Sequence, residues 1–398
     1  MGLHRPNFEP FFTWVNRGRI LYSPGSRDEI AFELGQLGAS KPLVITDKGL
    51  VKAGVADQVV DKLKVSELDI AGVFDAVRQD ARMENINEAA QFYRDSGADS
   101  LVALGGGSVM DTAKAVNILV GKELEDFKPL ADQAALWENA APLPPHIALP
   151  TTAGTGSEVT NVIVVLDSDS KSKVAVTHPF CNADLSILDP ELTIKLPSKI
   201  TAFTGMDALT HAIEGITSTG AQPISDALGL QAIRLIAHAL PLAVSEPENV
   251  EARGDMLIAA TMAGMCFCNS MLGATHAMAH ALGALYAVPH GLANAVMLPV
   301  VMEFNIEETA ERYSMIANAL GATSDGVYSK RNAIAALEAV KKLKLEVGLT
   351  ETLKDFNVPS DPEKLYDLVE LAAGDSQISY NPRQIDDADL LNLYLKAL

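Results

Sequence analysis

The pattern of apolar residues changes once along this chain, near residue 197. Before that point, short apolar stretches at residues 42–47 and 100–105 alternate with stretches that carry apolar residues at helical intervals of three and four. After it, the long periodic segments all have helical spacing. Alternating strands and helices are typical of a parallel α/β sheet. The sequence therefore predicts an α/β N-terminal domain with a parallel sheet and an all-α C-terminal domain.

The length of the chain also favours two domains. Its 398 residues exceed the ~250–300 residues at which a single hydrophobic core stops growing. Pro190 and Pro197 lie where the pattern changes, and each disfavours helical structure in the residue before it. We therefore expect one domain over residues 1–195 and a second over residues 196–398.

Composition excludes several classes of protein. Hydrophobic residues make up 48% of the chain and charged residues 21%, which is close to the average of globular proteins and unlike that of disordered ones. The formal net charge of −20 repels phosphate backbones and anionic lipids, so neither nucleic acid nor a membrane is expected as a partner. Three cysteines are too few for a disulfide framework and fit a reducing cytoplasm, and residues 1–24 show no pattern of an export signal.

A glycine-rich turn follows the second of these predicted strands. Residues 105–111 read GGGSVMD and open a predicted helix, where glycines let a phosphate approach the backbone and free N–H groups favour an anion. The motif differs from the GxGxxG fingerprint, because Met110 occupies the place of the third glycine. A tight turn without a ligand explains the same residues equally well. This turn is a candidate site for a dinucleotide or a phosphate, and Asp111, in the first turn of the helix, is a candidate contact.

A second polar loop strengthens the case for a dinucleotide. Residues 150–160 read PTTAGTGSEVT, and their five hydroxyl groups and two glycines offer donors to a ribose, an amide or a pyrophosphate. A Ser/Thr-rich turn is the alternative interpretation. Asp47 ends the first of the two predicted strands, where its carboxylate can accept hydrogen bonds from the adenosine ribose and repel a 2′-phosphate. This position favours NAD over NADP.

Four histidines and one aspartate form a pattern that predicts a metal site. Asp207 and His211 are four residues apart on a predicted helix, and so are His276 and His280, so each pair shares one helix face. His290 follows within Pro-His-Gly. Nitrogen ligands with one carboxylate suit Fe²⁺ or Zn²⁺, whereas Mg²⁺ prefers oxygen ligands. A single histidine on an apolar helix is more often a hydrogen-bonded core residue, but two such pairs are hard to obtain by chance.

Four segments with these motifs resemble the iron-dependent, or group III, alcohol dehydrogenase family. They are GGGSVMDTAK at residues 105–114, LPTTAGTGSEVT at 149–160, GMDALTHAIEG at 205–215 and HAMAHALGALYAVPHGLAN at 276–294. Their order and spacing match the family over nearly the whole chain. The resemblance implies an NAD-binding α/β domain and a helical, metal-binding catalytic domain, in a fold like that of dehydroquinate synthase, with the active site in the cleft between them.

The resemblance also assigns roles to single residues. The implied metal ligands are Asp207, His211, His276 and His290. His280 is implied to lie beside the nicotinamide, outside the ligand shell, where we expect it to relay the alcohol proton. Phe267 is implied to narrow the substrate cleft. The implied NAD contacts are Asp47, Gly106, Gly107, Ser108, Thr151, Thr152, Thr155 and Lys173.

One segment departs from the family. Many members carry a Pro-Asn-Pro-Thr-like stretch where residues 79–82 here read Gln-Asp-Ala-Arg. The cofactor contact of that asparagine is therefore not carried over, and Asp80 is the candidate to replace it.

The function implied by the resemblance is metal-dependent, NAD-linked interconversion of a small primary alcohol and its aldehyde by hydride transfer. The metal polarises the substrate oxygen, with Fe²⁺ as the expected ion and Zn²⁺ as the alternative. Competing interpretations are a zinc-dependent, glycerol-type polyol dehydrogenase, a dehydroquinate synthase-like lyase and a non-catalytic metal-binding protein. The lyase needs Lys or Arg near the metal for its anionic substrate, and the segments around Asp207, His276 and His290 contain none.

The resemblance finally implies a homo-oligomer, a dimer or larger. Residues 11–15 (FFTWV) resemble a stretch that adds a strand across the partner subunit in relatives.

Overall fold

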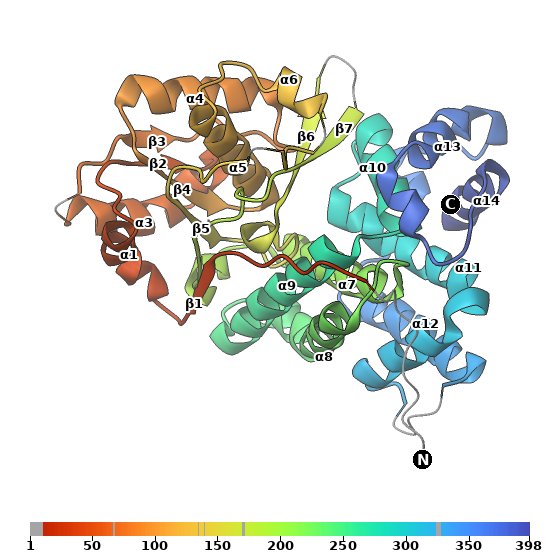
Figure 1. Ribbon diagram of the computed structural model, residues 1–398. Coiled ribbons are helices and arrows are strands. Elements are labelled where there is room, and N and C mark those ends of the chain that lie inside the picture. Colours follow the sequence, from red (N-terminus) through yellow and green to blue (C-terminus); the bar gives the residue numbers. More distant parts are fainter. Residues whose placement is uncertain (1–10, 67, 134, 139, 169–171, 324–327) are drawn as a thin grey trace. The chain divides into compact units, whose positions relative to one another are not determined.

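The computed structural model describes residues 11–66, 68–133, 135–138, 140–168, 172–323 and 328–398. Contacts divide the chain into two compact units (Figure 1). The α/β unit comprises the described parts of residues 16–197 and 246–261, and the helical unit those of residues 1–15, 198–245 and 262–398. The predicted α/β and all-α architectures are confirmed. The single division at residues 195/196 stays a prediction.

A parallel sheet of six strands forms the centre of the α/β unit. Its order is β1-β8-β5-β4-β2-β3. The strands are β1 (Arg19–Tyr22), β2 (Pro42–Ile45), β3 (Gly72–Phe74), β4 (Ser100–Gly105), β5 (His146–Pro150) and β8 (Leu185–Leu188). The two strands predicted around residues 42–47 and 100–105 are the neighbours β2 and β4. The turns that follow β2, β4 and β5 therefore lie at one edge of the sheet.

Helices cover both faces of this sheet (Figure 1). Side chains alternate along its strands, so each strand sends apolar side chains to both faces. On β4, Leu101 and Ala103 belong to the core that includes α4 and α5, whereas Val102 and Leu104 belong to the core that includes α1 and α3. The helices are α1 (Ile30–Gln36), α2 (Lys48–Lys52), α3 (Val55–Lys64), α4 (Met83–Ser96), α5 (Gly107–Gly121) and α6 (Lys128–Ala131), with 3-10 turns η1 (Ser26–Glu29), η2 (Ser157–Val159) and η3 (Pro190–Thr193). Burial on both faces explains why β2 and β4 are continuous apolar runs.

The α/β unit also contains an antiparallel hairpin that the sequence patterns did not predict. Strand β6 (Val162–Asp167) pairs with β7 (Ser172–Thr177) outside the main sheet. Ile163 and Val165 of β6 and Val176 of β7 join the core beneath α5, which holds the hairpin against the unit.

The helical unit is built around α7 (Ser198–Thr217), in which every residue from Gly205 to Thr217 is buried. Helices α8 and α11 pack against it. The other helices are α8 (Pro223–Ser245), α10 (Ala274–Tyr286), α11 (His290–Ala319), α12 (Lys330–Glu346), α13 (Tyr366–Ala373) and α14 (Asp387–Ala397), with 3-10 turns η4 (Leu353–Phe356), η5 (Pro362–Leu365) and η6 (Ser376–Tyr380). Helix α9 (Val250–Ser270) contributes residues to both units. The helical spacing after residue 197 is thus confirmed.

Among the described residues, α8 is long and apolar enough to cross a membrane by length and composition, and α9 and α10 meet the same criteria together across a 104° bend. Six apolar residues of α8 are fully buried: Ala232, Ile233, Ile236, Ala239, Leu240 and Ala243. This face of α8 is that of a helix packed in a protein core.

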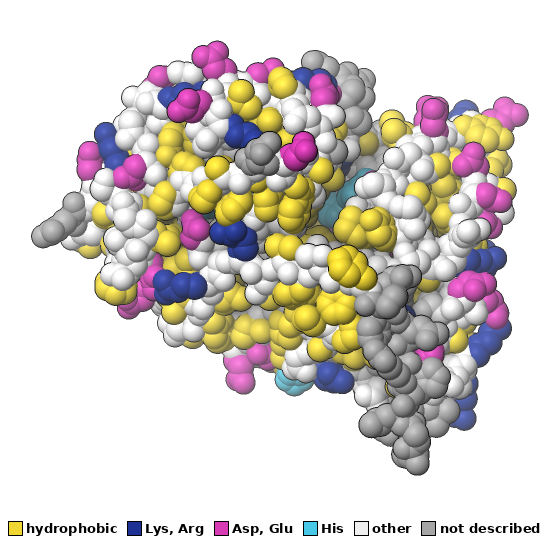
Figure 2. Space-filling view, viewed as in Figure 1, with side chains coloured by type: hydrophobic (Ala, Val, Ile, Leu, Met, Phe, Trp, Pro, Cys, Tyr) yellow, Lys and Arg dark blue, Asp and Glu magenta, His cyan; other side chains and the backbone are white. Residues whose placement is uncertain are grey.

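Charged side chains are scattered over the face of the molecule shown in Figure 2. Asp and Glu side chains lie among Lys, Arg and apolar side chains and form no single acidic patch on that face.

The contact between α7 and the start of α11 leads to a stability prediction. A Cβ on Gly291 would lie 2.4 Å from the backbone oxygen of Phe203 on α7. We expect Gly291→Ala to lower the free energy of unfolding by about 1–3 kcal/mol, because the two helices must separate. Denaturant unfolding measures the change. Gly374→Ala is the control, because its Cβ would meet no atom closer than 3.4 Å; equal stability of the two variants would contradict the packing argument.

Candidate metal centre and dinucleotide loops

Three helices of the helical unit bring four candidate ligands together. Asp207 and His211 lie one turn apart on α7, His276 lies in the first turn of α10, and His290 begins α11. One ligand atom from each side chain lies within 4.8 Å of the others. Asp207, His211 and His276 are buried, and His290 is half-buried. The structure therefore gathers the four residues selected from the sequence into one candidate metal centre.

The chemistry and size of this centre fit one divalent transition-metal ion. Imidazole nitrogens and a carboxylate oxygen are the donors that Fe²⁺ and Zn²⁺ bind in proteins. Bond lengths of about 2.0–2.2 Å place two ligand atoms of one ion up to about 4.4 Å apart. The four atoms, all within 4.8 Å of one another, therefore form a set that one ion can span with little adjustment.

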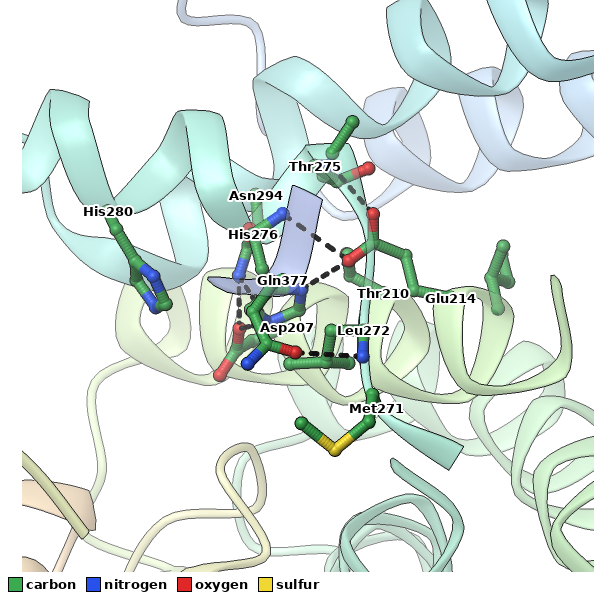
Figure 3. Close-up of polar contacts among 12 residues, drawn as sticks. Asp207, Thr210, Glu214, Met271, Leu272, Thr275, His276, His280, Asn294 and Gln377 are labelled. Atoms are coloured by element: carbon green, nitrogen blue, oxygen red, sulfur yellow. Dashed lines mark hydrogen bonds and ion pairs between the residues drawn. The ribbon is translucent and has the colours of Figure 1, made fainter. Parts of the chain in front are cut away.

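Glu214 lies on the side of His276 that faces away from Asp207 (Figure 3). This residue follows His211 by three positions on α7, and its Oε2 lies 2.6 Å from His276 Nδ1. Its Oε1 accepts a hydrogen bond of 2.7 Å from the backbone N–H of Thr275. Burial alone raises the pKa of Glu214, but hydrogen bonds from His276 and Thr275 hold that pKa below its ordinary value. The buried carboxylate is thus held by backbone donors at the start of α10.

Asn294 holds the carboxylate of Asp207. It follows His290 by four residues on α11, and its Nδ2 donates a hydrogen bond of 2.7 Å to Asp207 Oδ1. The same nitrogen lies 3.1 Å from His276 Nε2 and 3.3 Å from His290 Nε2. One amide group thus contacts three of the four candidate ligands. The sequence analysis missed both Asn294 and Glu214, although each lies at helical spacing from a candidate ligand.

Phe267 packs directly against the candidate metal centre. Its ring stacks on that of His211, with centroids 4.4 Å apart and planes 21° apart. His211 in turn stacks on His276 at 4.6 Å and 20°. This stack restrains the orientation of both imidazoles. The role of Phe267 in narrowing a substrate cleft stays a prediction.

His280 lies next to the candidate ligands and has a carboxylate partner of its own. Its Nδ1 is 2.7 Å from Asp375 Oδ2, and its ring stacks on His290 with centroids 5.3 Å apart. Burial alone raises the pKa of Asp375, but the hydrogen bond from His280 holds that pKa below its ordinary value. The sequence analysis missed Asp375, since it lies 95 residues from His280 and no local spacing relates the two.

In the α/β unit, the two loops predicted to bind a dinucleotide pack against each other. Helix α5 begins directly after β4, with Gly106 as its N-cap, so its first N–H groups face the carboxyl edge of the sheet. A Cβ on Gly106 would lie 3.2 Å from the Thr152 side chain, and one on Gly107 would lie 2.7 Å from that of Thr155. These glycines therefore allow the loop of residues 150–160 to lie over the start of α5.

A buried network holds the loop in this position. Lys114 is 1% exposed, and its Nζ donates to Ser157 Oγ at 2.7 Å, to Thr160 Oγ1 at 3.0 Å and to a backbone carbonyl of β6 at 2.9 Å. Asp111 accepts from Ser157 Oγ at 2.5 Å and from a backbone N–H of β6 at 3.0 Å. Both carboxylate oxygens of Asp111 are thus engaged within the unit. The sequence analysis assigned no role to Lys114 or Ser157.

The turn that departs from the family contains Asp80, which contacts two other candidates. Asp80 has a positive φ of 69°, and its carboxylate forms an ion pair of 2.8 Å with Lys173 on β7. Its backbone N–H donates to Ser108 Oγ at 3.0 Å. Asp47, at the carboxyl end of β2, caps α2 by accepting a hydrogen bond of 3.0 Å from the Leu50 N–H. The structure therefore joins Asp80, Lys173 and Ser108, and gives Asp47 a structural role as well.

Comparison with known protein families gives matches in both halves of the chain. A model described as iron-containing alcohol dehydrogenase matches residues 17–190. A model described as the C-terminal part of the Fe-containing alcohol dehydrogenase family matches residues 201–398.

Individual proteins match over almost their full lengths. A 1,3-propanediol dehydrogenase of Citrobacter freundii is 36% identical over 378 residues, which are 94% of this chain and 96% of the relative. A lactaldehyde reductase of Escherichia coli strain K12 is 36% identical over 381 residues, 96% of each chain. The crystal structure of a sulfoacetaldehyde reductase from Bifidobacterium kashiwanohense in complex with NAD⁺ is similar with a TM-score of 0.85 at 30% identity, covering 98% of this chain and 99% of that one.

The buried network around Lys114 leads to a prediction about the loop. Ser157→Ala removes the hydroxyl that bonds Lys114 and Asp111. We expect the free energy of unfolding to fall by about 1–3 kcal/mol, because buried partners lose a hydrogen bond. The loosened loop should also weaken the binding of NADH, the expected cofactor. Denaturant unfolding and NADH fluorescence titration measure the two effects.

The control for this variant is Ser23→Ala in the same unit, where an exposed hydroxyl contacts only a neighbouring carbonyl in a 3.2 Å hydrogen bond. If Ser157→Ala has the same free energy of unfolding and the same NADH affinity as the control, the network does not hold the loop.

Proposed function

We infer that this chain, which belongs to the iron-containing alcohol dehydrogenase family, interconverts a small primary alcohol and its aldehyde with NAD as the hydride carrier. The observation that carries this function is the gathering of Asp207, His211, His276 and His290 around one point. Two relatives are named for 1,3-propanediol and for lactaldehyde, which are small molecules with alcohol or aldehyde groups. The crystal structure of the similar sulfoacetaldehyde reductase is a complex with NAD⁺, which supports NAD as the cofactor here.

We propose that the four residues of the centre hold a divalent ion, Fe²⁺ first and Zn²⁺ as the alternative. When bound, the ion supplies Lewis acidity to the substrate oxygen, and NAD accepts or donates the hydride. The side chains around the centre hold its ligands in position. Asn294 orients the Asp207 carboxylate, and the stack with Phe267 restrains His211.

The proposed NAD contacts lie mainly at the carboxyl edge of the sheet. The first N–H groups of α5 favour the pyrophosphate, because they are unpaired within the helix and carry the positive end of its dipole. Asp111 acts through Ser157, whose hydroxyl it holds, and Asp80 with Lys173 replaces the family's asparagine. The proposed direct contacts are Asp47, Gly106, Gly107, Ser108, Thr151, Thr152, Thr155, Lys173 and His280.

His280 is proposed to relay the alcohol proton. The carboxylate of Asp375 faces its Nδ1, so Nε2 is the ring atom that exchanges a proton with the substrate side. Phe267 is proposed to narrow the cleft beside the centre, which favours small substrates.

A homo-oligomer in the cytoplasm completes the proposal. Among the described strands, β1 pairs only with β8, and its Ile20 and Tyr22 are 45% and 41% exposed. An exposed edge strand is a template for pairing with a second copy of the chain. Cys181, Cys266 and Cys268, all described by the structure, form no disulfide, which fits a reducing compartment.

The test is turnover by protein stripped of metal with a chelator and reloaded with Fe²⁺ or Zn²⁺. We expect NADH absorbance to change with 1,3-propanediol, lactaldehyde and short primary alcohols only after reloading. His276→Ala should lower kcat/KM by at least about 100-fold, because removing a ligand affects the centre more than removing an outer partner does.

The matched control is His238→Ala, which changes an exposed histidine of α8. Full activity of His276→Ala, or equal turnover with and without metal, would rule out the proposed centre. Preference for Zn²⁺ and glycerol would move the chain to the polyol dehydrogenases.

A further inference from the structure

We propose that Glu214 is a positioning residue of the metal centre, which holds His276 in the tautomer protonated at Nδ1 and so directs the lone pair of Nε2 to the ion. The inference rests on the proposed function, because it requires His276 to be a metal ligand. It adds to the centre a side chain that acts on a ligand and does not bind the ion itself.

The position of Glu214 follows from the spacing along α7. Asp207, His211 and Glu214 are at positions i, i+4 and i+7, so all three project from one face of the helix. The first two belong to the candidate ligand set, and the third reaches past it to the start of α10 (Figure 3). Glu214 is 4% exposed, so water does not compete for its hydrogen bonds.

The partners of this carboxylate are all donors. Oε1 accepts from the Thr275 N–H at 2.7 Å, and Oε2 accepts from the His276 N–H at 3.3 Å. These N–H groups lie in the first turn of α10, where the helix dipole favours a negative charge. Both carboxylate oxygens thus already accept from backbone N–H groups, and a proton on His276 Nδ1, which lies 2.6 Å from Oε2, adds a third donor to this set. A neutral imidazole protonated at Nδ1 has its lone pair on Nε2.

The atom left available by this arrangement is the one that faces the other ligands. His276 Nε2 lies 3.9 Å from Asp207 Oδ1 and 3.1 Å from the Asn294 amide nitrogen. Hydrogen bonding of the far ring nitrogen to a carboxylate also makes the near nitrogen a stronger donor to a metal. Glu214 and Asp207 together contribute two negative charges, which balance a divalent ion in a buried site.

Helix capping is the alternative role for Glu214, and the Glu214→Gln variant separates the two roles. The substitution keeps the size of the side chain but leaves it with one accepting and one donating end. If the amide oxygen faces Thr275, the NH₂ group faces Nδ1 and forces the proton to Nε2, where it blocks coordination. If the amide oxygen faces Nδ1, the NH₂ group opposes the Thr275 N–H. An aspartate is shorter but keeps two oxygens that can only accept hydrogen bonds when ionised.

The experiment compares Glu214→Gln and Glu214→Asp with wild-type full-length protein. Zn²⁺ affinity is measured by competition with a chromophoric chelator, the visible spectrum is recorded with Co²⁺, and thermal unfolding of metal-free protein reports the capping contribution. We expect Glu214→Gln to lower Zn²⁺ affinity by about 10- to 100-fold and to alter the Co²⁺ spectrum. Glu214→Asp should retain more Zn²⁺ affinity than Glu214→Gln, although aspartate differs more from glutamate in shape than glutamine does.

Two controls make the result specific. Asp226→Asn changes a buried carboxylate of α8 that pairs with Arg312 at 2.8 Å, and it should bind Zn²⁺ like wild type. His276→Ala reports whether His276 is a ligand at all. Wild-type affinity in His276→Ala would overturn the proposed centre and this inference with it.

If His276→Ala binds weakly, the Glu214 variants decide this inference alone. Wild-type Zn²⁺ affinity in Glu214→Gln would overturn it. The inference would also be overturned if Glu214→Asp lost more Zn²⁺ affinity than Glu214→Gln and also lost more thermal stability. That order is the one expected if Glu214 only caps α10.

Discussion

Burial of carboxylates is the constraint on which the helical unit depends. Helix α7 is buried from Gly205 to Thr217 and yet carries Asp207 and Glu214. A carboxylate in such a place costs several kcal/mol unless donors meet it. The donors come from other helices, as the Asn294 amide on α11 and the first turn of α10. The hydrogen bonds that satisfy both carboxylates therefore join α10 and α11 to α7, in the arrangement that brings the histidines together.

Local spacing predicted the parts of the site that lie within one element. Asp207 and His211 were recognised as a pair because they share a helix face, and so were His276 and His280. The residues that support them were not recognised. Glu214 is 62 residues before His276, and Asp375 is 95 residues after His280, so their contacts arise only when separate elements pack. Spacing along the sequence relates residues within one helix, whereas these carboxylates bind residues of other helices.

The same division holds in the α/β unit. Strands β2 and β4 were predicted because burial on both faces makes them continuous apolar runs. Strand β1 lies at the sheet edge with mostly exposed residues, and β3 has only three residues, so neither gives a comparable signal. The glycines of the turn after β4 were selected for their backbone freedom. The structure adds a second reason for Gly106 and Gly107, since side chains of the neighbouring loop occupy the space of a Cβ.

The amide of Asn294 has a consequence for how such a protein matures. Its nitrogen donates to Asp207 and lies within hydrogen-bond distance of two imidazole nitrogens that also face the centre. The two hydrogens of this NH₂ group can satisfy two of these three acceptors before an ion binds. Folding and metal acquisition can then be separate events in time. A newly made chain can reach its final shape first and acquire iron later, by exchanging hydrogen bonds for coordination bonds at a ligand set that is already assembled.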